Sequence, residues 1–137
     1  AEARSAFLQA ATLAPGEWEF WFLLAQFSLN FEIEIADLGL PAARNLITLN
    51  PSDPRSYDLL GYAHFLNGNT LLAERLLLKS IALQPTLASA HYHLGHLRRW
   101  QGRTEQSQAA FELALQLDID GPVGDLARRA LGLPQGE

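Results

Sequence analysis

The amino-acid sequence predicts an all-α protein in which similar helix pairs follow one another along the chain. Pro15, Pro51 and Pro85 are 36 and 34 residues apart, and proline commonly marks where one helix ends and the next begins. Six residues after each proline stands a large side chain, followed three residues later by leucine and then by a small residue. Between these marks, apolar residues recur at the three- and four-residue spacing of a helix face. The pattern predicts a stacked array of about eight helices.

Each repeated unit has two recognisable halves. The first half carries the motif Trp21-Leu24-Ala25, Tyr57-Leu60-Gly61 and His91-Leu94-Gly95. The second half carries Ala73, Leu77, Ser80 and Pro85, matched at the same intervals by Ser107, Phe111, Ala114 and Ile119. Ala3, Phe7, Ala10 and Pro15 read as the same half at the start of the chain, and Gly39, Ala43, Leu46 and Pro51 form a weaker copy.

The spacing, the small residues and the closing proline resemble the tetratricopeptide repeat, a unit of about 34 residues that folds as two antiparallel helices. The resemblance implies a right-handed superhelix of such pairs, a TPR α-solenoid, covering residues 1–137 as one domain. Its expected parts are 1–16 as the second helix of a truncated repeat, repeats at 17–52, 53–86 and 87–120, and a capping helix at 121–137. His91 stands where tryptophan is usual, and two extra residues precede Pro41.

Local chemistry places the helix ends. Asp53 before Pro54 suits a helix start, because the carboxylate accepts free backbone amides and the fixed φ of proline is compatible with the first turn. Gly68 and Gly102 suit the left-handed residue that ends a helix. We therefore expect helices at 2–13, 17–31, 39–50, 54–67, 70–83, 87–101, 104–117 and 123–132. Pro41 is expected to begin or kink the third helix.

The two ends of the chain predict different neighbours. Val123, Leu126, Ala127, Ala130 and Leu131 form one apolar stripe backed by Asp125, Arg128 and Arg129, as in a polar cap that closes an array. At the other end Phe7, Leu8 and Leu13 would meet solvent unless another segment or subunit covers them. The interpretation is a C-terminal part of a longer repeat array.

Composition narrows the classes of function. The net charge is −5 with one lysine, Lys79, which argues against nucleic acid, because phosphate binding requires clustered positive charge. No apolar run approaches the roughly 20 residues of a membrane-spanning helix, so no membrane insertion is expected. Cysteine is absent, which excludes disulfides and thiolate metal sites. We expect a cytoplasmic protein that uses no cofactor.

The resemblance implies where a ligand would bind. First helices of tetratricopeptide repeats line a concave groove, with the residue after the aromatic position and those four and seven further on pointing inward. The inward positions hold Phe22, Gln26 and Leu29, then Asp58, Tyr62 and Phe65, then Tyr92, His96 and Arg99. The candidate peptide-binding groove, with Trp100 at its rim, consists of Phe22, Gln26, Asp58, Tyr62, Phe65, Tyr92, His93, His96, Arg99 and Trp100. Aromatic side chains and arginine are the usual anchors of interfaces. The alternative is that Phe22, Leu29 and Phe65 are simply core.

The predicted function is therefore a protein-protein interaction module, a scaffold that holds a peptide or partner protein. The Lys, Asn and Arg clamp by which some relatives hold a terminal carboxylate is missing from the inward positions. The preferred ligand is a peptide with aromatic or aliphatic anchors and one acidic residue, which His93 or Arg99 would hold. The alternative function is a structural spacer or homo-oligomerisation segment, in which acidic residues of the first third meet Arg98, Arg99 and Arg103 of another copy.

Catalysis and metal binding have little support in the sequence. No serine lies in a glycine-flanked elbow and no loop has the pattern that cradles phosphate, so no enzyme activity is predicted. His93 and His96 are three residues apart and would supply two imidazoles, but two ligands from one helix do not complete a tetrahedral zinc site. Hydrogen-bonded or solvated histidines are the simpler interpretation.

A chelator should accordingly leave the melting temperature of the protein unchanged, because a core built from apolar side chains needs no metal. Differential scanning fluorimetry with and without EDTA measures this. A fall of several degrees would restore the histidine pair as a metal site.

Overall fold

The computed structural model describes residues 2–13 and 16–135, and these form eight α-helices and one short π-helix. The elements are α1 (Glu2–Leu13), α2 (Trp18–Asn30), η1 (Ile35–Gly39), α3 (Leu40–Leu49), α4 (Pro54–Leu66), α5 (Thr70–Leu83), α6 (Ala88–Trp100), α7 (Thr104–Leu117) and α8 (Pro122–Leu131). No strand occurs in these residues. The predicted all-α class is confirmed, and each predicted α-helix ends within one residue of the observed helix.

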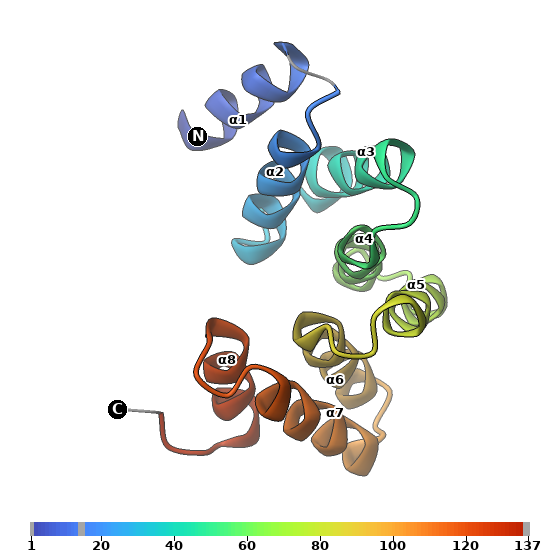
Figure 1. The fold of residues 1–137 in the computed structure, drawn as a ribbon, viewed down its shortest axis with the longest axis vertical. Coiled ribbons are helices and arrows are strands. Elements are labelled where there is room, and N and C mark those ends of the chain that lie inside the picture. The colour runs from blue at the N-terminus through green and yellow to red at the C-terminus, as the bar shows by residue number, and fades with distance from the viewer. Residues whose placement is uncertain (1, 14–15, 136–137) are drawn as a thin grey trace.

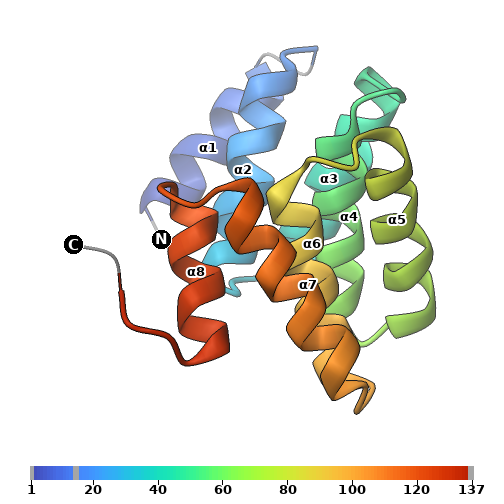
Figure 2. The same ribbon diagram turned by 60° about the horizontal axis from the view of Figure 1, so that its bottom comes forward.

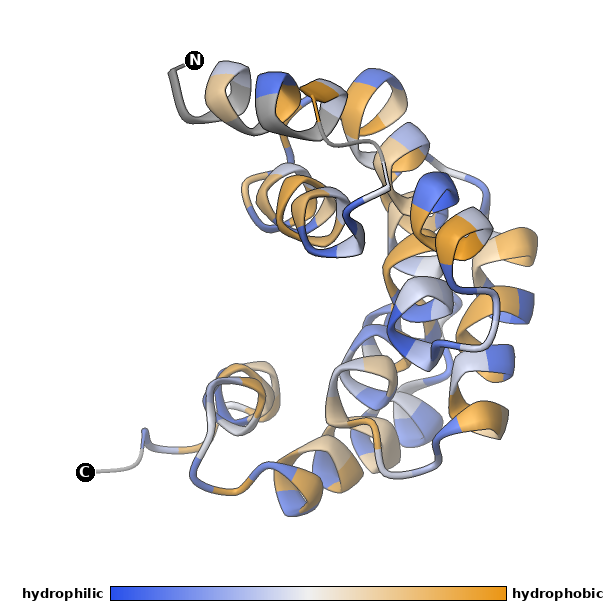
Figure 3. Ribbon diagram, turned by 45° about the horizontal axis from the view of Figure 1, so that its top comes forward, coloured by the Kyte–Doolittle hydropathy of each residue, from blue (hydrophilic) through white to orange (hydrophobic). Residues whose placement is uncertain are grey.

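Successive helices pack side by side in antiparallel pairs, and the pairs follow a curved path (Figures 1 and 2). In the view of Figure 3 the ribbon has the outline of a letter C, with α2 and α8 at its two open ends. Side chains of α2, α4, α6 and α8 line one common groove, so we call these the inner helices. Helices α1, α3, α5 and α7 are the outer helices.

Local chemistry explains where α4 begins and how α4 and α6 end. Asp53 caps α4 by accepting a hydrogen bond from the amide of Arg55, and Pro54 occupies the first turn. At the ends of α4 and α6 the chain turns through Gly68 and Gly102, whose φ angles are 88° and 74°. Glycine adopts this left-handed conformation at no steric cost. Both turns lead directly into an outer helix, as the sequence predicts.

The two extra residues of the first unit are absorbed just before α3. Glu32 and Glu34 have φ angles of 51° and 50°, which is unusual for residues with a side chain. The chain then forms the π-helical turn η1, which runs directly into α3. Pro41 lies in the first turn of α3, where proline is well tolerated. The expectation that a helix begins at Pro41 or kinks there is therefore met by a helix start at Leu40.

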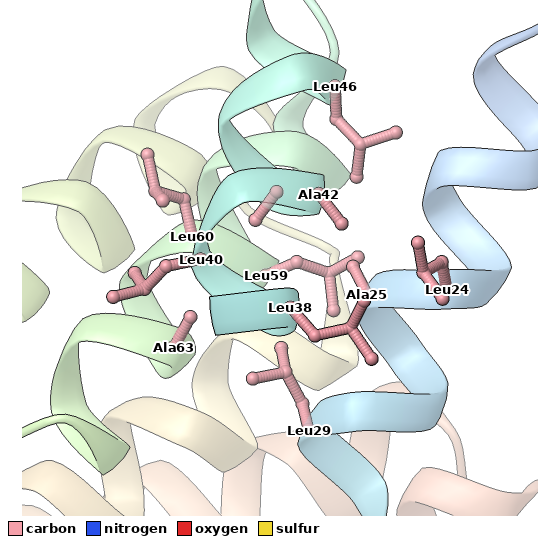
Figure 4. Packing of buried hydrophobic residues seen from close by; sticks show 11 residues of the cluster. Leu24, Ala25, Leu29, Leu38, Leu40, Ala42, Leu46, Leu59, Leu60 and Ala63 are labelled. Atoms are coloured by element: carbon pink, nitrogen blue, oxygen red, sulfur yellow. The ribbon is translucent and has the colours of Figure 1, made fainter. Parts of the chain in front are cut away.

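The core is continuous from helix to helix and consists mainly of leucine and alanine. One cluster joins α2, η1, α3 and α4, and Figure 4 shows its side chains converging: Leu24, Ala25, Leu29, Leu38, Leu40, Ala42, Ala43, Leu46, Leu59, Leu60 and Ala63. Further along, Leu77 on α5 and Phe111 on α7 are fully buried. Each faces a glycine of the inner helix that precedes it, Gly61 and Gly95 respectively. Inner and outer helices therefore approach closely at these points.

Side chains also tie the ends of the helices to carbonyl groups. The hydroxyl of Tyr57 donates to the carbonyl of Pro51 at 2.9 Å. In the next unit the Nε2–H of His91 donates to the carbonyl of Pro85 at 2.8 Å. The two hydrogen bonds are at equivalent positions of successive repeats, so His91 replaces the usual aromatic residue and keeps the hydrogen bond. None of the helices in the described residues is long and apolar enough to cross a bilayer.

Gly95→Ala should lower the free energy of unfolding by about 1–3 kcal/mol, because the added Cβ would lie 2.6 Å from the ring of the fully buried Phe111. Urea unfolding of this variant measures the change. Gly16→Ala is the control, because nothing lies within 4 Å of the Cβ position there. Adding Phe111→Leu should restore part of the loss, because the preceding unit pairs its glycine with Leu77. Equal stabilities of the Gly95 and Gly16 variants would contradict the close-packing argument.

Candidate functional site: the groove of the inner helices

The groove of the inner helices has a cavity volume of about 260 Å³. Six of the ten predicted site residues line it: Phe22 and Gln26 on α2, Asp58 and Tyr62 on α4, and Tyr92 and His93 on α6. Leu29, which the sequence also places among the inward positions, lines it too. The equal register of the inner helices explains why these side chains converge. Whether the groove binds a peptide stays a prediction.

A buried carboxylate lies in the wall of the groove and joins two inner helices. Asp58 on α4 is 2% exposed. Its Oδ2 accepts a hydrogen bond from the hydroxyl of Ser89 at 2.6 Å, and its Oδ1 accepts one from Nδ1 of His93, also at 2.6 Å. Both partners are on α6. Because Nδ1 carries the hydrogen in this bond, Nε2 is the ring nitrogen that remains for a ligand. We call this set the Asp58 cluster.

Two tyrosines flank the imidazole of His93. The ring of Tyr62 stacks on it with a centroid separation of 4.0 Å, and the tilted ring of Tyr92 lies 5.6 Å away. Burial raises the pKa of Tyr62 to about 12 and also raises the pKa of Tyr92. Both phenols therefore stay protonated at neutral pH. Neither hydroxyl has a hydrogen-bond partner among the described residues, so both are available to a ligand.

Arg55 forms one edge of the groove and was not among the predicted site residues. Its guanidinium lies 4.4 Å from the ring centroid of Trp18 and 5.5 Å from that of Phe22, and these two rings stack at 4.8 Å. It also forms an ion pair of 2.7 Å with Asp53. The arrangement fixes the ring of Phe22 against the groove. The spacing along the helix could have identified it, because Arg55 stands one turn before Asp58 and so lies on the same face of α4.

Helix α8 completes the groove on the side opposite α2. Pro122, Val123 and Leu126 line the cavity, whereas the sequence had assigned Val123 and Leu126 only to a stripe packed on the last repeat. The register again explains the result, since α8 begins 34 residues after α6 and Leu126 is equivalent to Tyr92. The capping helix therefore also serves as a fourth inner helix.

Four predicted residues lie outside this cavity. Phe65 stacks on Tyr62 at 6.1 Å, further along α4. The ring of His96 packs edge-on between Tyr92 and Phe111. Arg99 stacks on Phe111 at 4.8 Å, and its Nη2 donates a hydrogen bond of 2.7 Å to the carbonyl of Ala130. Trp100 is exposed at the end of α6.

Arg99 instead lines a second cavity of about 250 Å³, between α6, α7 and α8. Its bond to the carbonyl of Ala130 attaches α8 to α6, which is a structural role. Within the described residues no group of three or more histidine, cysteine, aspartate or glutamate side chains is placed to hold a metal ion. His93 is bonded to Asp58, and His96 lies among aromatic rings.

Comparison with known proteins identifies the repeat. Residues 88–118 match the family model of the tetratricopeptide repeat. A thermophilic TPR protein of Thermus thermophilus, TTC0263, superposes with a TM-score of 0.76 at 19% identity, covering 95% of this chain and 73% of that one. The Arabidopsis OM64 TPR domain gives a TM-score of 0.66 at 17% identity, covering 84% and 93%. No curated protein matches the chain in sequence.

MamA from Desulfovibrio magneticus is a third similar structure, with a TM-score of 0.69 at 21% identity. The superposition covers 85% of this chain and 64% of that one, so the chain spans less than two thirds of this relative's length. At these identities the likeness shows the fold. The fold is a helical repeat array with a groove lined by its inner helices. Residues 88–118 of the chain match a tetratricopeptide repeat, and the whole fold is similar to that of TPR proteins.

Stability should fall as the pH is lowered from 6.5 towards 4, because burial lowers the pKa of His96 to about 4. Between these values the unfolded chain binds a proton that the folded chain does not, so acid favours unfolding. Allowing for the partial exposure of the ring, the loss between pH 7 and pH 5 should be about 1 kcal/mol. Urea unfolding at both pH values measures it. His96→Phe should reduce this pH dependence by that amount, and an unchanged dependence would contradict the assignment.

Proposed function

We propose that the chain is an interaction scaffold whose inner groove binds a peptide segment of a partner protein. The observation that carries the proposal is the convergence of side chains from four inner helices on one cavity, with apolar walls and polar atoms that lack internal partners. Binding sites combine these two properties, since apolar area supplies affinity and a few polar groups fix orientation.

The size of the cavity indicates how the peptide is held. About 260 Å³ accommodates one large side chain and its adjoining backbone rather than a small folded domain. Phe22 on one side and Val123 and Leu126 on the other supply apolar walls for that side chain. The anchor residue of the ligand is therefore aromatic or aliphatic.

The polar atoms of the groove favour a ligand that accepts hydrogen bonds. The hydroxyls of Tyr62 and Tyr92 are protonated and free, and the amides of Gln26 and Asn30 line the same cavity. The oxygens of Asp58 are already used by Ser89 and His93. Backbone carbonyls, or one acidic side chain beside the anchor, fit this set of donors.

Leu126→Ala should weaken binding of a groove ligand about tenfold or more, because it removes an apolar wall at the cavity. The ligand is a peptide selected from a random library on the intact chain, and affinity is measured by fluorescence anisotropy. The matched control is Leu113→Ala on outer helix α7, since the two leucines are 39% and 37% exposed. The control should bind as the parent does.

Tyr92→Phe adds a second test that leaves the ring in place. It removes only the free hydroxyl, so it should lower affinity several-fold with little change in melting temperature. If Leu126→Ala and Tyr92→Phe both bind every selected peptide as the parent does, the peptides bind elsewhere and the groove proposal is wrong.

A further inference from the structure

The N-terminal side of α2 carries exposed apolar residues, although the equivalent positions in the later inner helices are buried, or partly buried at His93. The inner helices start at residues 18, 54, 88 and 122, so position 23 in α2 is equivalent to 59 in α4 and 127 in α8. Leu23 is 45% exposed, whereas Leu59 is 7% exposed and Ala127 is fully buried. Phe20 is 37% exposed, and its equivalents Ser56 and Ala90 are fully buried.

In α4 the equivalent face is buried by helices that precede it in the array, and within the described residues α2 lacks one of these helices. Leu59 and Ala63 pack into the cluster formed by the preceding inner helix α2 and the preceding outer helix α3 (Figure 4). Helix α2 packs against an outer helix, α1, but no inner helix precedes it in the described chain. The exposed face of α2 is therefore the surface on which a preceding inner helix would pack, and it continues the interface between successive repeats.

The exposure of α1 itself is ordinary. Leu8 and Leu13 are exposed, but so are Leu78 and Leu83 at the equivalent positions of α5. Such residues lie on the outer surface of the array in each unit. The side chain of Phe7 lies outside the described part of the chain. The unusual feature is confined to α2, at Phe20 and Leu23.

The equivalence of positions between inner helices also predicts which charge a helix packed on this face should carry. Helix α4 presents Asp58 to Ser89 and His93 of α6. The residues equivalent to Ser89 and His93 in α2 are Glu19 and Leu23. A helix placed before α2, as α4 is placed before α6, thus faces a carboxylate and a leucine. A basic residue at its Asp58 position would pair with Glu19, whereas an acidic one would be repelled.

A second copy of the chain is a poor occupant. Residues 5–43 contain Glu17, Glu19, Glu32, Glu34 and Asp37 but no lysine or arginine, so two such faces would bring like charges together. The inner helix at the other end, α8, carries Arg129 where α4 and α6 carry the glycines that allow an outer helix to approach. Its side chain would block packing against α1.

We infer that the face at Phe20 and Leu23 docks an amphipathic helix from outside residues 1–137, stacked as an inner helix of the array. That helix carries an apolar stripe against α2, a small residue where it crosses α1, and lysine or arginine opposite Glu19. This surface is separate from the groove and does not depend on the proposed function.

A graft tests the fit. Residues 53–70 are copied before Ala1, so that the copied α4 and its turn precede α1 in the register in which α4 precedes α5. The copy is made with Asp58 retained and with Asp58→Lys. The lysine graft should raise the melting temperature by about 5 °C or more, because it buries the bare face. The aspartate graft should give a smaller rise, and the difference should shrink at high salt.

Leu23→Lys, made in both the parent chain and the lysine graft, completes a double-mutant cycle that tests whether the graft stabilises the protein through this face. In the parent chain it should change the melting temperature little, and in the lysine graft it should remove most of the gain. Leu78→Lys is the matched control at 44% exposure on α5, and it should act equally in both chains. The inference is overturned if neither graft is stabilised or if Leu23→Lys acts as the control does. It is also overturned if sedimentation shows that the parent dimerises through Leu23.

Discussion

The close approach of each inner helix to the outer helix that follows it is the constraint on which the rest of the structure depends. Gly61 and Gly95 leave no room for a Cβ beside Leu77 and Phe111, so the helix pairs interlock at fixed points. That contact sets the register of these two units. Because the inner helices share this register, side chains separated by 34 or 36 residues in sequence meet along one groove. The groove is thus a consequence of how the inner helices pack against the outer helices.

The Asp58 cluster is a second link between units, of a different chemical kind. A buried carboxylate is costly unless it is fully hydrogen-bonded, and here Ser89 and His93 satisfy it from the next inner helix. The apolar core alone would tolerate small sliding of α4 against α6. The two short hydrogen bonds to the carboxylate would break if the helices slid. They therefore fix the position of the His93 ring and, through stacking, that of the Tyr62 ring.

The fold could be read almost entirely from the sequence, because it follows from local signals that recur. Proline, glycine and apolar spacing located each α-helix, including the start near Pro41. The π-helical turn η1 had no such signal, since it depends on left-handed Glu32 and Glu34, which are rare conformations. In the groove, register identified Phe22, Gln26, Leu29, Asp58, Tyr62 and Tyr92, whereas the further inward positions Phe65, His96 and Arg99 lie outside it. Arg55, Ser89 and the lining by α8 were missed because they depend on contacts between units.

Repeat proteins are generally regarded as modular, with units that can be duplicated, deleted or reordered. The Asp58 cluster makes this chain an exception at one joint. If the unit at 53–86 were duplicated, the first copy of Asp58 would face Arg55 and Leu59 of the second instead of Ser89 and His93. Its buried carboxylate would lose both of its hydrogen bonds and would meet a guanidinium that already pairs with Asp53. The order of these two units is therefore what keeps the carboxylate of Asp58 bonded to Ser89 and His93.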